Sequence, residues 1–142
     1  MSIITLDQHN RAELAQALAA EGWVVACLCA AWCDVCCQYR PAFEELAGRH
    51  PDLSFAWIDI EDQADVVGDI DVDNFPTLLI QRGDTVAFFG TVLPDARLAE
   101  RLLLAQTRKT AAELQREAQG SPEQRAWQEE CNLRRLLQEA HD

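Results

Sequence analysis

The stretch WVVACLCAAWCDVCC, residues 23–37, contains both the strongest fold signal and the main chemical motif of this sequence. Trp23–Leu28 is a continuous apolar run with β-branched side chains, which is typical of a strand buried in the middle of a sheet. From Cys33 to about Arg49 the apolar side chains recur at helical spacing. The stretch therefore predicts a central strand that leads through a short loop into a helix, with a cluster of cysteines in the first turn.

Strand and helix patterns alternate on both sides of this stretch. Strands are expected at 3–6, 53–60, 77–81 and 86–90, and helices at 7–20, 62–69 and from Pro94 onward, with Asp95 in the first turn. Arg82-Gly83-Asp84 between the last two strands is a hairpin signal. The alternation predicts an α/β fold of three layers, with a mixed central sheet and helices on both faces.

Cys33 and Cys36 form a Cys-X-X-Cys pair at the expected start of the helix. Unpaired backbone N–H groups and the positive end of the helix dipole stabilise a thiolate at the first cysteine. The second cysteine lies three residues later on the same side of the first turn, where it can close a disulfide. This arrangement predicts thiol–disulfide exchange, in which Cys33 attacks a disulfide and Cys36 resolves the mixed disulfide.

Over residues 1–105 the chain resembles the thioredoxin family. The resemblance rests on Trp32-Cys33-x-x-Cys36, on Pro41 five residues later, on Phe75-Pro76-Thr77, and on Gly83 and Gly90. It implies a thioredoxin-like fold and a disulfide oxidoreductase without an organic cofactor, supplied with electrons by a separate reductase or thiol pool. It also implies that Trp32, Phe75, Pro76 and Thr77 bind protein substrates, with a cis peptide before Pro76.

The chain departs from the family pattern at the residues that handle protons. Asp34 and Val35 replace the usual Gly-Pro between the cysteines, and a carboxylate beside Cys33 opposes thiolate formation. The family's buried aspartate aligns with Cys27, and its lysine partner aligns with Trp57. A family tryptophan aligns with Cys29. The nucleophile pair is thus present without the usual proton-handling pair, and Asp34, Val35 and Cys27 are expected to modulate its reactivity.

The remaining cysteines have alternative interpretations. Cys27 and Cys29 are two residues apart on one strand, so they share a face and are expected to be small core side chains. Cys37 is expected to be exposed or half-buried, where it modulates the pair by competing for Cys36 or assisting a metal. Cys131 is expected to serve packing. A thiolate metal site is the weakest alternative, because closed zinc sites need four ligands at paired spacings.

Composition narrows the possible partners. The 142 residues include 24 acidic and 12 basic side chains, a net charge of −12, which excludes the basic footprint of nucleic-acid binders and disfavours anionic membrane surfaces. Residues 59–73 contain acidic but no basic side chains. Partners are therefore expected to have neutral or basic surfaces. The N-terminus lacks a secretory pattern, and the longest uncharged run is too short to span a bilayer, so a cytoplasmic location is expected.

Residues 106–142 are expected to form a nearly neutral helical extension of the 1–105 domain. Ser121 and Pro122 are a strong helix start, and Ala126, Leu133, Leu137 and Ala140 would share one face of a single helix. This face could pack back on the domain, dock a partner or form a homodimer. The appended helices also leave open a non-catalytic chaperone or docking module as the alternative to an enzyme.

Overall fold

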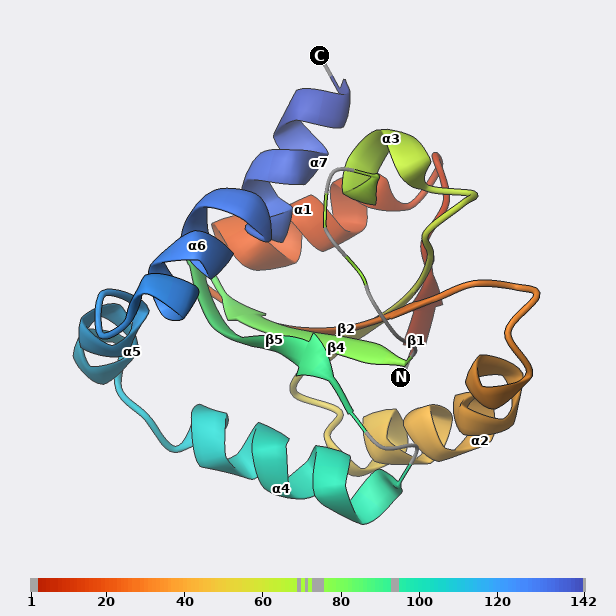
Figure 1. Cartoon of the computed structure of the whole chain (residues 1–142), viewed down its shortest axis with the longest axis horizontal. Helices are drawn as coiled ribbons and strands as arrows, with labels where there is room; N and C mark the ends of the chain where they lie inside the picture. The colour runs from red at the N-terminus through yellow and green to blue at the C-terminus, as the bar shows by residue number, and fades with distance from the viewer. Residues whose placement is uncertain (1–2, 69, 71, 73–75, 93–94, 142) are drawn as a thin grey trace.

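A five-stranded mixed sheet forms the centre of the computed structural model, which describes residues 3–68, 70, 72, 76–92 and 95–141 (Figure 1). The strands are β1 (Ile3–Thr5), β2 (Trp23–Cys29), β3 (Ser54–Asp59), β4 (Thr77–Arg82) and β5 (Thr85–Thr91), in the order β1-β3-β2-β4-β5. Strands β1, β3 and β2 are parallel, whereas β4 runs antiparallel to β2 and β5 antiparallel to β4. The predicted mixed sheet with an antiparallel edge is confirmed.

Helices cover both faces of this sheet. They are α1 (Arg11–Ala19), α2 (Asp34–Arg49), α3 (Ala64–Val67), α4 (Ala96–Thr107), α5 (Ala111–Ala118), α6 (Pro122–Glu130) and α7 (Leu133–His141). Helices α2 and α4 lie below the sheet in Figure 1, and α1, α3 and α7 lie above it, which confirms the three layers. Within the described residues, no helix combines the length and apolar character required to cross a membrane.

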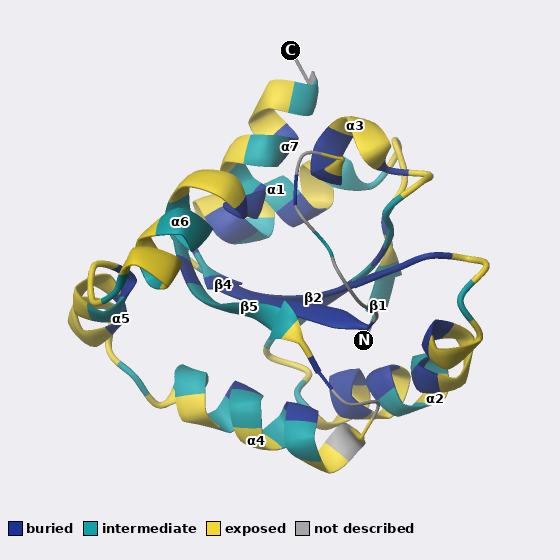
Figure 2. Ribbon diagram, in the orientation of Figure 1, coloured by how far each residue is buried: buried dark blue, intermediate teal, exposed yellow. Residues whose placement is uncertain are grey.

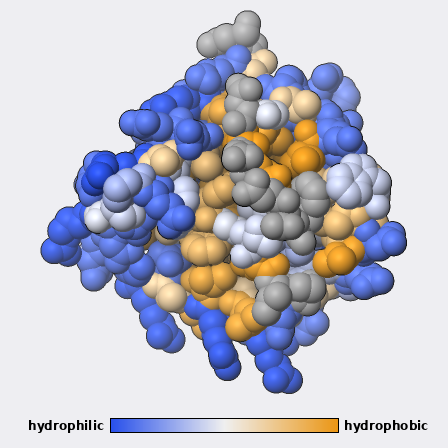
Figure 3. Space-filling view, viewed as in Figure 1, coloured by the Kyte–Doolittle hydropathy of each residue, from blue (hydrophilic) through white to orange (hydrophobic). Residues whose placement is uncertain are grey.

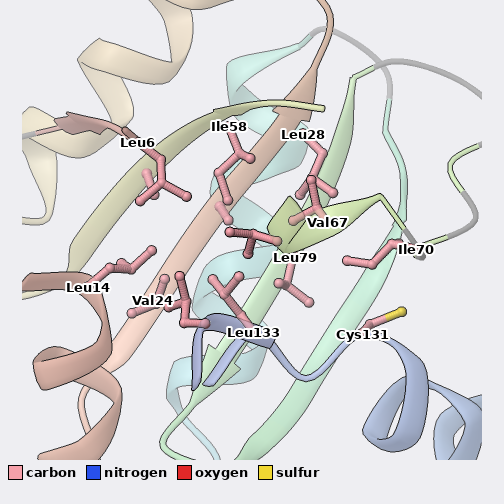
Figure 4. Packing of buried hydrophobic residues seen from close by; sticks show 14 of the residues in the cluster. Leu6, Leu14, Val24, Leu28, Ile58, Val67, Ile70, Leu79, Cys131 and Leu133 are labelled. Carbon is pink, nitrogen blue, oxygen red and sulfur yellow. The ribbon is translucent and has the colours of Figure 1, made fainter. Parts of the chain in front are cut away.

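The sheet separates two hydrophobic cores, and β2 contributes to both of them. Val24, Ala26 and Leu28 face the core under α1, α3 and α7 (Figure 4). Val25, Cys27 and Cys29 face the core under α2 and α4. Every residue of β2 after Trp23 is buried, as the dark strand in Figure 2 shows. This alternation confirms that Cys27 and Cys29 share a face, because side chains two apart on a strand point the same way.

Local start and turn signals correspond closely to the observed elements. Gly83 forms the hairpin turn between β4 and β5 with a φ of +55°, a left-handed conformation that glycine adopts at low cost. The hydroxyl of Ser121 accepts a hydrogen bond from the backbone of Gln124, which confirms it as the cap of α6. Asp95 differs from the expectation, because it caps α4 by accepting from Arg97 N instead of lying in the first turn. Pro94 lies outside the described residues.

The expected single C-terminal helix is wrong, because two helices, α6 and α7, are separated at Cys131 and Asn132. The cause is a buried amide cluster that ties this break to the sheet. Gln81 Nε2 donates to Asn132 Oδ1 at 2.7 Å, and Asn132 Nδ2 donates to Asp84 Oδ1 at 2.8 Å. The backbone N–H of Leu133 donates to Gln81 Oε1 at 2.9 Å. These bonds fix the start of α7 against the β4–β5 hairpin.

The C-terminal helices pack back on the domain. Leu133 and Leu137 are buried in the core above the sheet together with Cys131. The side-chain amide of Gln128 accepts from the backbone N–H of Val86 and donates to its carbonyl, both at 2.8 Å. This pair of bonds replaces a neighbouring strand at the edge strand β5. The sequence predicted a domain boundary at residue 105, and this position lies within α4.

We predict that Asn132→Ala lowers the free energy of unfolding by about 1–3 kcal/mol, because it removes hydrogen-bond partners from Gln81 and Asp84 around a buried site. Urea denaturation followed by far-UV circular dichroism measures this change. Gln138→Ala on the exposed side of α7 is the matched control, with an expected change within about 0.5 kcal/mol. Equal effects of the two substitutions would contradict the role assigned to the amide cluster.

Candidate active site

Cys33 lies at the N-cap of α2, where the sequence predicted it. Its backbone N–H donates to Ala30 O at 3.0 Å, and its carbonyl accepts from Cys37 N at 3.1 Å. The side chain is half-buried, so a substrate sulfur can reach it. Asp34 follows in the first turn with an exposed side chain. A thiol at the N-cap lies near the free N–H groups of the first turn, although Cys33 makes no side-chain cap hydrogen bond, and one carboxylate follows it in the sequence.

Cys36 lies behind Cys33 and is only 1% exposed. Burial raises the pKa of its thiol, and a hydrogen bond with the Cys29 thiol raises it further. The neighbouring Cys33 thiol raises this pKa as well. Cys36 is therefore a protonated thiol at neutral pH, buried in the same core as Cys27 and Cys29.

The loop that precedes Cys33 is held by Asp59 at the end of β3. Asp59 Oδ2 accepts from Ala31 N at 3.1 Å, and Oδ1 accepts from the backbone of Glu61 at 2.8 Å and of Asp62 at 3.1 Å. Asp59 therefore ties the loop before the cysteine pair to the loop after β3. Sequence reasoning placed Asp59 only in an acidic run. Its position at the end of a strand beside the central one is the signal that could have identified it.

Apolar side chains surround Cys33 on the surface. Trp32 is 65% exposed and Val35 43% exposed, and these are the large exposed hydrophobic side chains among the described residues. Figure 3 shows that hydrophilic side chains cover the rim of the viewed face, whereas apolar surface is found in its middle. The site thus offers an apolar contact to a substrate on an otherwise strongly acidic protein.

Pro76 and Thr77 lie at the same end of the sheet as the cysteine pair. Thr77 pairs with Leu28 of β2, which places Pro76 beside the end of β2 near Cys29. The carbonyl of Pro76 accepts from Val92 N at 3.0 Å, and both Pro76 and Thr77 are buried. Phe75 and the peptide bond before Pro76 lie outside the described residues. The structure thus brings Pro76 and Thr77 to the sheet end from which the chain runs to Cys33.

Cys27 and Trp57, which align with the aspartate and the lysine of the family pattern, are register partners on β2 and β3. Cys27 is completely buried, and its sulfur lies 3.5 Å from that of Cys29. The guanidinium of Arg40 lies over the Trp57 ring, 5.0 Å from its centroid. A thiol and an aromatic ring thus occupy the places of the expected carboxylate and lysine.

Tyr39 closes the core around these sulfurs. Its side chain is 2% exposed, and its hydroxyl has no hydrogen-bond partner within the described part of the chain. Burial raises the pKa of Tyr39, and the nearby Cys27 and Cys29 raise it further. Sequence reasoning missed Tyr39 because its spacing is that of any core residue of α2. The hydroxyl is a free hydrogen-bond donor in a cluster of thiols.

The other two cysteines lie apart from this core. Cys37 is exposed, which agrees with the expectation of an exposed or half-buried thiol, and its thiol donates to Ala31 O at 3.7 Å. Cys131 is buried between α6 and α7, and burial raises its pKa to about 12. In the described ranges, no group of three or more histidine, cysteine, aspartate or glutamate side chains is arranged to hold a metal ion.

The fold has three layers, and a pair of cysteines lies at the first turn of a helix beside the central strands of its mixed sheet. This arrangement defines a class of thiol–disulfide exchange proteins. The sequence profile described as Thioredoxin matches residues 4–103. The chain belongs to the thioredoxin family. It is 36% identical over 97 residues to a putative thioredoxin 2 of Streptomyces coelicolor, which covers 63% of this chain and 72% of that protein.

Solved structures show the same fold. A thioredoxin h from poplar superposes with a TM-score of 0.65 at 23% identity, covering 77% of this chain and 97% of its own. A chain from the complex of ferredoxin:thioredoxin reductase with thioredoxin f2 superposes with a TM-score of 0.64 at 18% identity, covering 76% of this chain and 96% of its own. The thioredoxin-like fold expected from the sequence is confirmed.

We predict that Asp34→Asn speeds the alkylation of Cys33 by iodoacetamide at pH 7 about two- to fivefold. Removing a negative charge beside the helix N-terminus favours the thiolate by about 0.3–1 kcal/mol. Peptide mass spectrometry separates the labelling of Cys33 from that of the exposed Cys37. Asp52→Asn, which removes an exposed charge far along the chain, should leave the rate unchanged. An unchanged rate in Asp34→Asn would show that Asp34 does not modulate Cys33.

Proposed function

We propose that this chain catalyses thiol–disulfide exchange on protein disulfides through Cys33 and Cys36. The observation that carries the proposal is the accessible Cys33 thiol at the N-cap of α2, followed three residues later in the first turn by the buried Cys36 thiol. The Cys33 thiolate attacks one sulfur of a substrate disulfide, and the other substrate sulfur leaves as a thiol. Cys36 then attacks Cys33, which forms the Cys33–Cys36 disulfide and releases the second substrate thiol.

The surroundings of Cys33 support a polypeptide substrate. Trp32 and Val35 offer exposed apolar contacts, and Pro76 and Thr77 would align an extended chain at the end of the sheet. With a net charge of −12, the protein favours substrates with neutral or basic surfaces. No organic cofactor takes part. A separate reductase or thiol pool would restore the dithiol, and the location proposed for this cycle is the cytoplasm.

The resolving step is proposed to be slow. Cys36 must lose its proton before it attacks; burial and the Cys29 thiol raise its pKa, and the backbone of Ala30 lowers it only in part. A buried neutral thiol is a poor nucleophile and its neighbouring thiols are poor bases. Mixed disulfides with substrates should therefore last longer than in a protein with a carboxylate at the position of Cys27.

A second candidate function is a non-catalytic docking module. It is favoured by the thiol at Cys27 and by the additional helices, of which α5 and α6 bring a further surface next to β5 and α7 packs on α1 and α3. This surface could hold a partner or a second copy of the chain. In that case the cysteine pair would be dispensable for function.

We predict that the protein reduces insulin disulfides in the presence of dithiothreitol at a rate above the background of the thiol alone. Turbidity from the precipitating insulin B chain measures the rate. Cys33→Ser should reduce turnover to the background, because Cys33 is the thiol at the N-cap of α2 and the exposed Cys37 lies one turn further along the helix.

Cys37→Ser is the matched control, since it removes an exposed thiol of the same helix and should keep most of the activity. A wild-type rate equal to the dithiothreitol background would contradict the oxidoreductase proposal and favour the docking module. Loss of activity in Cys37→Ser alone would assign the resolving role to Cys37 in place of Cys36.

A further inference from the structure

A cavity of about 400 Å³ lies between the end of β5 and helix α6, and we call it the α6 pocket. Its walls include Thr77 of β4, Thr91 of β5, and Glu123, Trp127 and Glu130 of α6. The three residues of α6 are spaced four and three positions apart, so they share one face of the helix. The C-terminal extension therefore adds a wall to a cavity at the sheet end next to the cysteine pair.

This wall is held rigidly against the sheet. Figure 1 shows α6 beside β5, where Gln128 makes its two hydrogen bonds with the backbone of Val86. The buried amide cluster anchors the break that follows the helix. The half-buried ring of Trp127 packs edge-on against Phe88, with 5.9 Å between the ring centroids. The α6 pocket is therefore formed before any ligand enters it.

The charge of the pocket is negative and is not neutralised by the described residues. Glu123 and Glu130 are exposed, and neither makes a hydrogen bond or an ion pair with another described residue. Glu130 is the last residue of α6, at the negative end of the helix dipole, and the last turn contains no basic side chain. Burial and then the charge of Glu130 raise the pKa of the adjacent Cys131 thiol. None of the described lining residues is basic.

An aromatic ring between two carboxylates is suited to a cationic side chain. Trp127 lies between Glu123 and Glu130 along the helix, so an ammonium or guanidinium group can meet the ring and accept ion pairs on either side. The methylene stem of lysine or arginine packs well on apolar walls while its charged head reaches the carboxylates. A negative or uncharged polar side chain would gain neither contact.

We propose that the α6 pocket binds a lysine or arginine side chain of the polypeptide whose disulfide Cys33 attacks. The inference rests on the proposed exchange activity and specifies its substrates as polypeptides with a basic residue close to the disulfide. Residues 106–142, which add helix α6, would then serve substrate selection.

The place of the pocket sets the distance between the two substrate residues. Thr77 is the register partner of Leu28 on β2 and of Thr91 on β5, so all three strands meet at this end of the sheet. Strand β5 lies two strand spacings, about 10 Å, from β2. An extended polypeptide covers that distance in about three residues. The basic residue is therefore expected within about four positions of the substrate cysteine.

A lysine scan of a small substrate tests the inference. Disulfide-linked dimers of a short peptide with one cysteine are reduced with dithiothreitol as the donor, and liquid chromatography measures kcat/KM above the dithiothreitol background. Each peptide contains one lysine within four positions of the cysteine, and its reference contains glutamine there. The best lysine peptide should exceed its reference about five- to tenfold. About 1 M sodium chloride should reduce this ratio towards one, because salt screens exposed charges.

Two double variants separate the pocket from the overall charge. Glu123→Gln with Glu130→Gln should bring the rates of the lysine and glutamine peptides together. Glu129→Gln with Glu139→Gln removes the same charge from exposed positions outside the pocket and should preserve the preference. Equal rates for the two peptides in the wild type would overturn the inference while the exchange activity stands. An equal loss of preference in both double variants would also overturn it, in favour of a general charge effect.

Binding is measured separately from activity. A lysine peptide with serine in place of its cysteine is titrated into the ¹⁵N-labelled protein, and the amide signals of Gly90 and Trp127, both of which line the pocket, should shift. If no peptide is reduced above the background, the proposed function is contradicted, and these shifts decide the inference alone. Absent shifts, or equal shifts with the glutamine peptide, would overturn it.

Discussion

The position of the cysteine pair depends on the burial of β2 between β3 and β4. Parallel pairing with β3 on one side and antiparallel pairing with β4 on the other fix the end of this strand. From there the chain needs only the short loop held by Asp59 to reach the cap of α2. The accessible thiol at Cys33 and the buried thiol at Cys36 follow from that fixed geometry. Shifting β2 by one residue would turn Cys27 and Cys29 to the other core.

The same strand explains how this protein differs from the pattern of its family. Cys27 and Cys29 face the core of α2, where a carboxylate would serve as a base for Cys36. With thiols in these places, the interior beneath the site contains weakly acidic groups in place of a base. The loss of the usual base and the gain of a second buried thiol beside it follow from two substitutions on one face of β2.

Elements with local signals could be predicted from the sequence, and contacts between distant segments could not. The apolar run of β2, the turn at Gly83 and the cap at Ser121 depend on neighbouring residues, and all three occur where they were expected. The break between α6 and α7 depends on Gln81, which is about 50 residues away in the chain, so helical spacing alone predicted one continuous helix. The core shared by Cys36 of α2 with Cys27 and Cys29 of β2 likewise joins a helix to a strand, and no spacing rule shows it.

The most direct test of the account is the identity of the cysteine that binds a substrate. A Cys36→Ser, Cys37→Ser double variant is incubated with native insulin, whose disulfides are intact. The reaction is quenched with acid, the protein is digested, and the mixed disulfide is mapped by mass spectrometry. We predict a stable adduct in which an insulin cysteine is bonded to Cys33, because both helix thiols that could resolve it have been replaced by serine. An absent adduct, or one attached at Cys131, would contradict the claim that the cap of α2 is the active site.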